Sequence, residues 1–195
     1  MADFEEAYKK TMSHEGKYSI DPTDEGGETY CGISRRWFPD WEGWAIVDAS
    51  RSKDGFPRCL DDYNVLQPLI PLFYKQHFWN RFQGDKIKNQ EVTNELFDTA
   101  VNMSVSDSVK FLQIGLNVLN RNQALYPDMT DDGVLGPTTL TNFNKYVSAE
   151  RGNVSMLLKV MNVLQGQHYI EYMNKSPVQE KYCRGWFNRV EIKKV

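Results

Sequence analysis

The sequence is poor in the residue types that mark several classes of protein. Only three of its 195 residues are cysteines (Cys31, Cys59 and Cys183), an odd number without a CxxC pair, which speaks against a disulfide framework or a zinc site. Its three histidines are scattered, and His14-Glu15 lacks the second histidine of a zinc-protease helix. We therefore expect no metal and no cofactor.

An excess of positive charge and long apolar runs are also missing. The chain has 23 Lys and Arg against 26 Asp and Glu, a formal net charge of −3, so its charge gives no indication of nucleic-acid binding. No stretch approaches the length of a membrane span, and residues 1–20 lack the apolar core of a signal peptide. We therefore expect synthesis in the cytoplasm, with assisted release if the substrate lies outside.

The composition that is present belongs to a globular protein. Hydrophobic residues make up 41% and charged residues 25%, close to the averages for such proteins. Aromatic residues are abundant at 13%. Their faces suit a carbohydrate groove, although aromatic side chains more often fill a core.

The N-terminal half predicts one helix, a hairpin and a helical stretch. Residues 3–14 show helical apolar spacing, with Asp3 as the candidate N-cap. Residues 19–34 are rich in Asp, Gly, Thr and Pro, which is typical of turns and a short β-hairpin. Residues 35–56 have weak periodicity, and residues 58–82 look helical with interruptions at two prolines.

The rest of the chain is predicted to be mainly helical. Apolar residues recur at helical spacing from residue 89 onward, a turn-rich segment covers residues 127–137, and Pro137 is placed to open another helix. A long helix is expected through about Met173, and Trp186 and Phe187 of the tail are expected to be packed. The predicted fold class is mostly α (α+β), with a small N-terminal β-hairpin.

Residues 14–33 have the composition expected of a catalytic segment. Glu15 ends the first helix and faces a glycine-rich hairpin that contains further carboxylates and a threonine. Cleavage of a glycosidic bond needs one protonated acid for the leaving oxygen and a second polar group on the opposite face of the sugar ring. Burial between helix and hairpin would raise the pKa of Glu15, because desolvation penalises the charged form.

The motifs in this segment and beyond resemble those of glycoside hydrolase family 108, a group of bacterial and phage N-acetylmuramidases. The run EGxY is followed by DPxDxGGxTxxGI, with Lys17 where the family usually has glycine. The resemblance continues through residues 96–102, 112–117, 132–139 and 185–190, and the later half is similar to a peptidoglycan-binding type 3 region. It implies a lysozyme-like helical fold, with a catalytic region over 1–105 and a helical peptidoglycan-binding region over 106–195 in the same globule.

The resemblance implies that Glu15 is the general acid. Lysozymes of T-even phages are similar in a looser way, since they place an Asp nine positions after the catalytic Glu and a Thr shortly beyond; Asp24 and Thr29 occupy those positions here. We therefore expect Asp24 and Thr29 to hold the attacking water, which predicts inversion and carboxyl groups roughly 6.5–9.5 Å apart. Asp21 is the rival second carboxylate, or fixes the hairpin through an Asx-turn before Pro22.

Three further residues are candidates for substrate binding. Asp98 and Asn102 lie four positions apart on one face of an otherwise apolar helix, where they either line the cleft or tie the helix to the hairpin. Tyr30 either stacks on sugar or belongs to the core. Glu25 and Glu28 are interpreted as solvated turn residues.

The resemblance implies a hydrolase that cuts the β-1,4 bond between N-acetylmuramic acid and N-acetylglucosamine in peptidoglycan glycan strands. Two alternatives remain: a lytic transglycosylase, and a non-catalytic wall-binding or secretion accessory protein. Relatives include endolysins and proteins labelled secretion activators, so a holin or secretion-system partner for export is expected. The protein is expected to be a monomer that acts on the cell wall.

Overall fold

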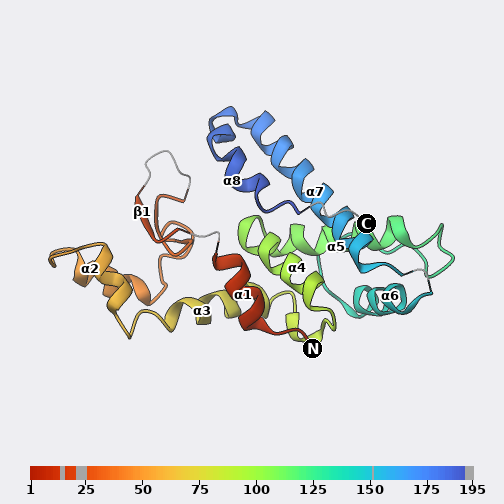
Figure 1. The fold of residues 1–195 in the computed structure, drawn as a ribbon, viewed down its shortest axis with the longest axis horizontal. Coiled ribbons are helices and arrows are strands. Elements are labelled where there is room, and N and C mark those ends of the chain that lie inside the picture. Colours follow the sequence, from red (N-terminus) through yellow and green to blue (C-terminus); the bar gives the residue numbers. More distant parts are fainter. Residues whose placement is uncertain (14–15, 21–25, 151, 192–195) are drawn as a thin grey trace.

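The computed structural model describes residues 1–13, 16–20, 26–150 and 152–191, and shows a mostly helical protein with one small sheet (Figure 1). Helix α1 (Phe4–Met12) begins where the sequence predicts, because the Asp3 side chain accepts a hydrogen bond from the Glu5 N–H at 2.8 Å. The buried residues Phe4, Ala7 and Thr11 form the inner face of this helix.

The predicted hairpin is confirmed and gains a third strand. Strands β1 (Tyr18–Ile20), β2 (Glu28–Tyr30) and β3 (Ile33–Ser34) form an antiparallel sheet in that order. The β2–β3 connection has two residues, Cys31 and Gly32, both with positive φ (48° and 78°). Two positive φ values in a two-residue loop match the twist of the flanking strands, which is why so short a third strand can pair.

The segment between the sheet and residue 89 is built of short helices. They are α2 (Gly43–Ser50), the 3-10 helix η1 (Arg58–Asp62), α3 (Leu69–Tyr74), the π-helical turn η2 (Lys75–Trp79) and the 3-10 helix η3 (Gly84–Lys86). Helix α2 is not predicted by the weak periodicity of residues 35–56. Of the two prolines expected to interrupt residues 58–82, Pro68 precedes α3 and Pro71 lies in its first turn, where proline costs no helical hydrogen bond.

Longer helices make up the remainder. They are α4 (Gln90–Asn102), α5 (Val105–Leu119), α6 (Pro137–Ser148) and α7 (Val154–Lys175), followed by η4 (Pro177–Tyr182) and α8 (Cys183–Phe187). Asn89, Ser104 and Asn153 cap α4, α5 and α7 through their side chains. Pro137 opens α6 and α7 continues past Met173, as predicted.

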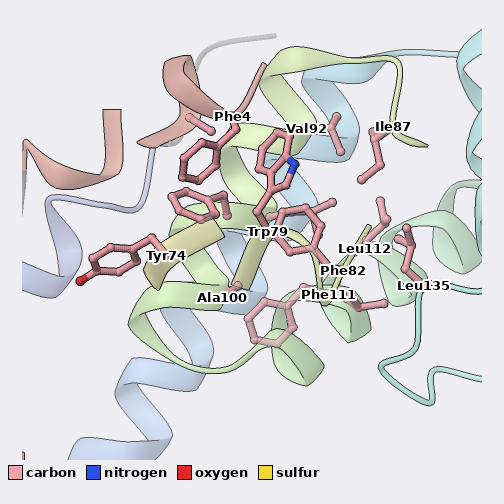
Figure 2. Packing of buried hydrophobic residues seen from close by; sticks show 14 of the residues in the cluster. Phe4, Tyr74, Trp79, Phe82, Ile87, Val92, Ala100, Phe111, Leu112 and Leu135 are labelled. Carbon is pink, nitrogen blue, oxygen red and sulfur yellow. The ribbon is translucent and has the colours of Figure 1, made fainter. Parts of the chain in front are cut away.

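The hydrophobic core is centred on α4, which packs against α1, α5 and α7. Trp79 is fully buried, and its ring meets those of Phe4 and Phe97 edge to face at 5.5 and 6.1 Å (Figure 2). The cluster continues without a break to Leu112 of α5 and to Leu157 of α7. Residues from both halves of the chain therefore share one core.

The C-terminal aromatic residues are less packed than predicted: Phe187 is exposed, and Trp186 is only partly buried. Phe187 is 37% exposed, Trp186 is half-buried, and α8 contains no buried residue. Helix α8 has five residues and lies beside α7 on the side of the sheet (Figure 1), so its aromatic side chains stay within reach of solvent.

Candidate active site

A cleft of about 700 Å³ separates the sheet from the C-terminal helices. Figure 1 shows the strands on one side, α7 and α8 on the other, and α4 between them. The sheet wall consists of Gly16, Lys17, Ser19, Gly26, Thr29, Gly32, Ser34 and Trp37. The floor is the end of α4, with Val101, Asn102 and Met103, and the opposite wall consists of His168, Tyr169, Tyr172, Gln179, Tyr182 and Trp186.

A row of three hydroxyl groups crosses the sheet on its cleft side. Thr29 of β2 pairs with Ser19 of β1 and with Ser34 of β3, and all three line the cleft. Directly paired residues of an antiparallel sheet point to the same face, so the register brings these side chains together. The Ser34 hydroxyl also donates a hydrogen bond to the Gly26 carbonyl at 2.7 Å, which ties β3 to the residues just before β2. The sequence analysis identified Thr29 but neither serine.

Of the two alternatives considered for Tyr30, the structure supports the core position and not sugar stacking, because Tyr30 is buried and does not line the cleft. Its side chain is 1% exposed, its ring stacks at 6.4 Å on Trp41, and its hydroxyl accepts a hydrogen bond from Gln67 at 3.2 Å. The physical reason is the alternation of a strand: Thr29 faces the cleft, so its neighbour faces the opposite side.

The residues just after Glu15 lie at the cleft. Gly16 and Lys17 both line it, and the Lys17 ammonium forms an ion pair with Asp61 of η1, which raises the pKa of Lys17. Lys17 thus ties the segment that follows Glu15 to the helices behind the sheet. The expected catalytic residues Glu15 and Asp24, and the rival Asp21, lie outside the described residues.

Asn102 and Asp98 lie on α4 but in different surroundings. Asn102 lines the cleft floor, where its Oδ1 accepts a hydrogen bond of 2.6 Å from the hydroxyl of Tyr169 on α7. Asp98 does not line the cleft; its Oδ1 lies 2.7 Å from Nη1 of the buried Arg189 in a largely buried ion pair. Asp98 therefore ties α4 to the C-terminal tail, and the helix-to-hairpin contact considered for it is absent from the described structure.

The wall opposite the sheet is aromatic. The Trp186 ring lies 5.3 Å from Tyr169 at an angle of 17°, and 5.8 and 5.9 Å from Tyr172 and Tyr182. Tyr169 is buried, whereas the other three rings are half-buried and remain accessible from the cleft. Across the cleft, Trp37 is 61% exposed and its ring lies 5.4 Å from the Arg36 guanidinium.

The back of the sheet is held by a network of ions that the sequence did not reveal. Glu28, interpreted as a solvated turn residue, has a side chain only 15% exposed and pairs with Arg35 at 2.8 Å and with Arg51 at 2.5 Å. Both arginines also contact Asp48 of α2, and the Tyr18 hydroxyl donates to Glu28 at 2.9 Å. This network fixes the sheet to α2 and so sets the position of the cleft wall.

The described lining of the cleft is mainly polar and aromatic, with the Lys17 ammonium at its sheet wall. Hydroxyl and amide groups on two sides and rings on the third suit a ligand with many hydroxyl groups and apolar ring faces. Within the described ranges, no three His, Cys, Asp or Glu side chains come together in positions that could hold a metal ion.

The comparisons with known proteins agree with this geometry. The family model "Glycosyl hydrolase 108" matches residues 8–104, and "Predicted Peptidoglycan domain" matches residues 107–191. The solved structure of SagA from Brucella abortus superposes with a TM-score of 0.61 at 20% identity, covering 96% of this chain and 88% of that one, which shows a shared fold. None of the curated proteins compared with the chain matches it.

None of the helices that the structure describes is both long enough and apolar enough to cross a bilayer. The two family matches together cover nearly the whole sequence. The first ends just before α5, at residue 104, and the second begins in the first turn of α5, at residue 107. The first matched family is one of glycosyl hydrolases, and the second is a peptidoglycan domain. The chain therefore belongs to glycosyl hydrolase family 108, with a C-terminal peptidoglycan domain, and at the level of these families it is a peptidoglycan hydrolase.

Proposed function

We propose that the protein is an N-acetylmuramidase that hydrolyses the β-1,4 bond between N-acetylmuramic acid and N-acetylglucosamine, with Glu15 as the general acid. One observation carries the proposal: residues of both motifs line the same cleft, Gly16 and Lys17 from the EGxY motif and Gly26 and Thr29 from the hairpin motif. Residues one position after Glu15 and two positions after Asp24 thus lie at one groove of a size that holds sugar rings.

The proposed mechanism divides the reaction between two sides of the glycan. Glu15 donates a proton to the leaving glycosidic oxygen while water attacks the anomeric carbon from the opposite face. Asp24 accepts a proton from that water, and the Thr29 hydroxyl holds the water in place. Ser19 and Ser34, which flank Thr29 in the sheet, are positioned to bind substrate hydroxyl groups or water. A water between carboxylate and sugar gives inversion at the anomeric carbon.

The test is turnover of purified sacculi by the wild-type protein and by Glu15→Gln. Loss of the acid proton is expected to reduce kcat by roughly 10²- to 10⁴-fold, because general acid catalysis contributes about that much. The matched control is Glu42→Gln, which removes an exposed carboxylate ahead of α2 that makes no side-chain cap hydrogen bond. Near wild-type turnover by Glu15→Gln contradicts the proposal.

The products identify the bond and the reaction. Hydrolysis at the proposed bond leaves N-acetylmuramic acid as the new reducing end, which borohydride reduction and mass spectrometry detect. Products that end in anhydromuramic acid, lighter by one water, indicate a lytic transglycosylase instead. Binding to sacculi without any soluble product indicates a non-catalytic wall-binding protein.

A further inference from the structure

Gln179 stands out in the C-terminal wall because it is a largely buried residue at the cleft whose side-chain amide has no hydrogen-bond partner in the described structure. The residue lies in η4, is 6% exposed and lines the cleft. Its backbone N–H donates to Ser176, but its side-chain amide makes no hydrogen bond to any part of the chain that the structure describes. A primary amide in a largely buried position is free to pair with a ligand in the cleft, and a ligand that satisfies it gains affinity and selectivity.

The surroundings of Gln179 indicate what kind of ligand that is. Tyr182, three residues later in the chain, and Trp186 of α8 line the same wall, with ring centroids 5.9 Å apart. Aromatic faces in a cleft pack against the apolar face of a pyranose ring. The amide of Gln179 therefore lies beside a surface suited to a sugar ring, where it can reach a substituent of that ring.

A primary amide offers both a donor and an acceptor, which limits the matching substituent. Gln179 Nε2 donates and Oε1 accepts, so a ligand group with a carbonyl and an adjacent N–H pairs with both atoms at once. The acetamido group of an N-acetylated sugar is such a group. A hydroxyl in its place is too short to bond both atoms of the side chain.

We propose that Gln179 is a specificity-determining residue that pairs with the acetamido group of an N-acetylated sugar, while Trp186 and Tyr182 pack against the ring. This inference rests on the proposed function in that it takes the cleft to be the glycan-binding groove. It assigns the peptidoglycan domain a part in selecting substrate within that groove, in addition to any contact elsewhere on the wall.

The test compares two neutral oligosaccharides that differ at the second carbon of each ring. Chitotetraose carries acetamido groups and cellotetraose carries hydroxyl groups, and their affinities are measured by calorimetry in a Glu15→Gln background, which prevents turnover. The Gln179→Met variant keeps side-chain length and removes the amide. We expect it to bind chitotetraose roughly 5- to 50-fold more weakly, as the loss of two hydrogen bonds predicts, and to change cellotetraose affinity by less than about twofold.

Three further variants make the result specific. Gln179→Glu keeps an acceptor and loses the donor, so its preference for chitotetraose also falls. Trp186→Ala weakens both sugars, because ring packing does not depend on the substituent at the second carbon. Gln167→Met alters an exposed glutamine on α7 that bonds to Glu171 and does not line the cleft, and it serves as the matched control with wild-type affinities.

Two outcomes overturn the inference. One is an unchanged preference for chitotetraose in Gln179→Met when its thermal unfolding shows a folded protein. The other is an equal loss for both sugars, which identifies a merely structural role. Failure of the proposed function is distinguishable, because a protein that leaves sacculi intact but loses acetamido selectivity with Gln179→Met contradicts the first proposal and supports this one.

Discussion

Glu95 lies on α4 where this helix faces α1 and α7, and the residue is 8% exposed. It lines a second cavity of about 250 Å³. Burial raises the pKa of its carboxyl group from the ordinary value of 4.5 to about 7, and the nearby Asp98 adds to the rise, whereas Asn162 and Lys10 offset part of it. The other charged residues around the cavity come from α1, α4, α7 and the tail: Glu6, Glu91, Lys159 and Glu191.

The raised pKa of Glu95 predicts a stability that falls as pH rises. Between pH 4.5 and about 7 the folded protein holds a proton that the unfolded chain releases, so the free energy of unfolding decreases across this range. The change corresponds to roughly 3 kcal/mol and is complete above pH 7. Glu95→Gln cannot release that proton, and we expect urea unfolding of the variant to depend less on pH. Equal pH dependence of the two proteins contradicts this prediction.

For single residues, the sequence predicts positions that belong to a motif, but not positions that depend on tertiary packing. The positions of Asn102 and Thr29 at the cleft follow from motif and spacing, and their roles in substrate binding and catalysis stay predictions. Strand alternation places Thr29 and Tyr30 on opposite faces of the sheet. The position of Gln179 has no signal in the sequence, because the burial of this residue depends on how η4 packs against α7 and α8.

At the scale of elements, the sheet depends on charge pairs with α2. The sheet has only two- and three-residue strands, so its own ladder stabilises it weakly, and the Glu28 carboxylate connects it to Arg35 and Arg51. The Arg35 guanidinium also lies 4.3 Å from the centre of the Trp44 ring, so the contact with α2 is partly apolar.

Glu28→Gln is expected to loosen the sheet and α2 together. Removal of the charge leaves the two arginines with Asp48 but without the less exposed of their two shared carboxylates, which is expected to cost about 1–3 kcal/mol of unfolding free energy in urea. Hydrogen exchange of the Thr29 and Tyr30 amides is expected to speed up more than that of α5 amides. Glu42→Gln is the control, and identical stability and exchange in both variants would show that the network contributes nothing.

Short elements escape sequence analysis for a physical reason. Helix α2 has no side-chain cap and only eight residues, so it depends on buried Trp44 and Val47 and on the ion pairs of Asp48. These are tertiary contacts, which no local pattern reveals. The long helices α4, α5 and α7 contain apolar residues at helical spacing, and the sequence predicts them for that reason.

At the scale of the molecule, the two family regions share one core. Helix α4, the last of the first region, packs against α5 and α7 of the second, and Tyr169 bonds to Asn102 across the boundary. We expect one cooperative thermal transition in scanning calorimetry, with equal calorimetric and van't Hoff enthalpies, because neither region can expose its side of the core while the other stays folded. Two separate transitions would contradict this prediction.

The course of the cleft through both family regions bears on how such proteins can evolve. One wall is provided before residue 104 and the other after residue 107, with α4 beneath them. Exchange of the C-terminal region between relatives would replace half of the groove as well as half of the α4–α5–α7 packing. The two regions are therefore constrained to diverge as a pair, and a recombined chimera would need compensating changes on both sides of the junction to recover a working enzyme.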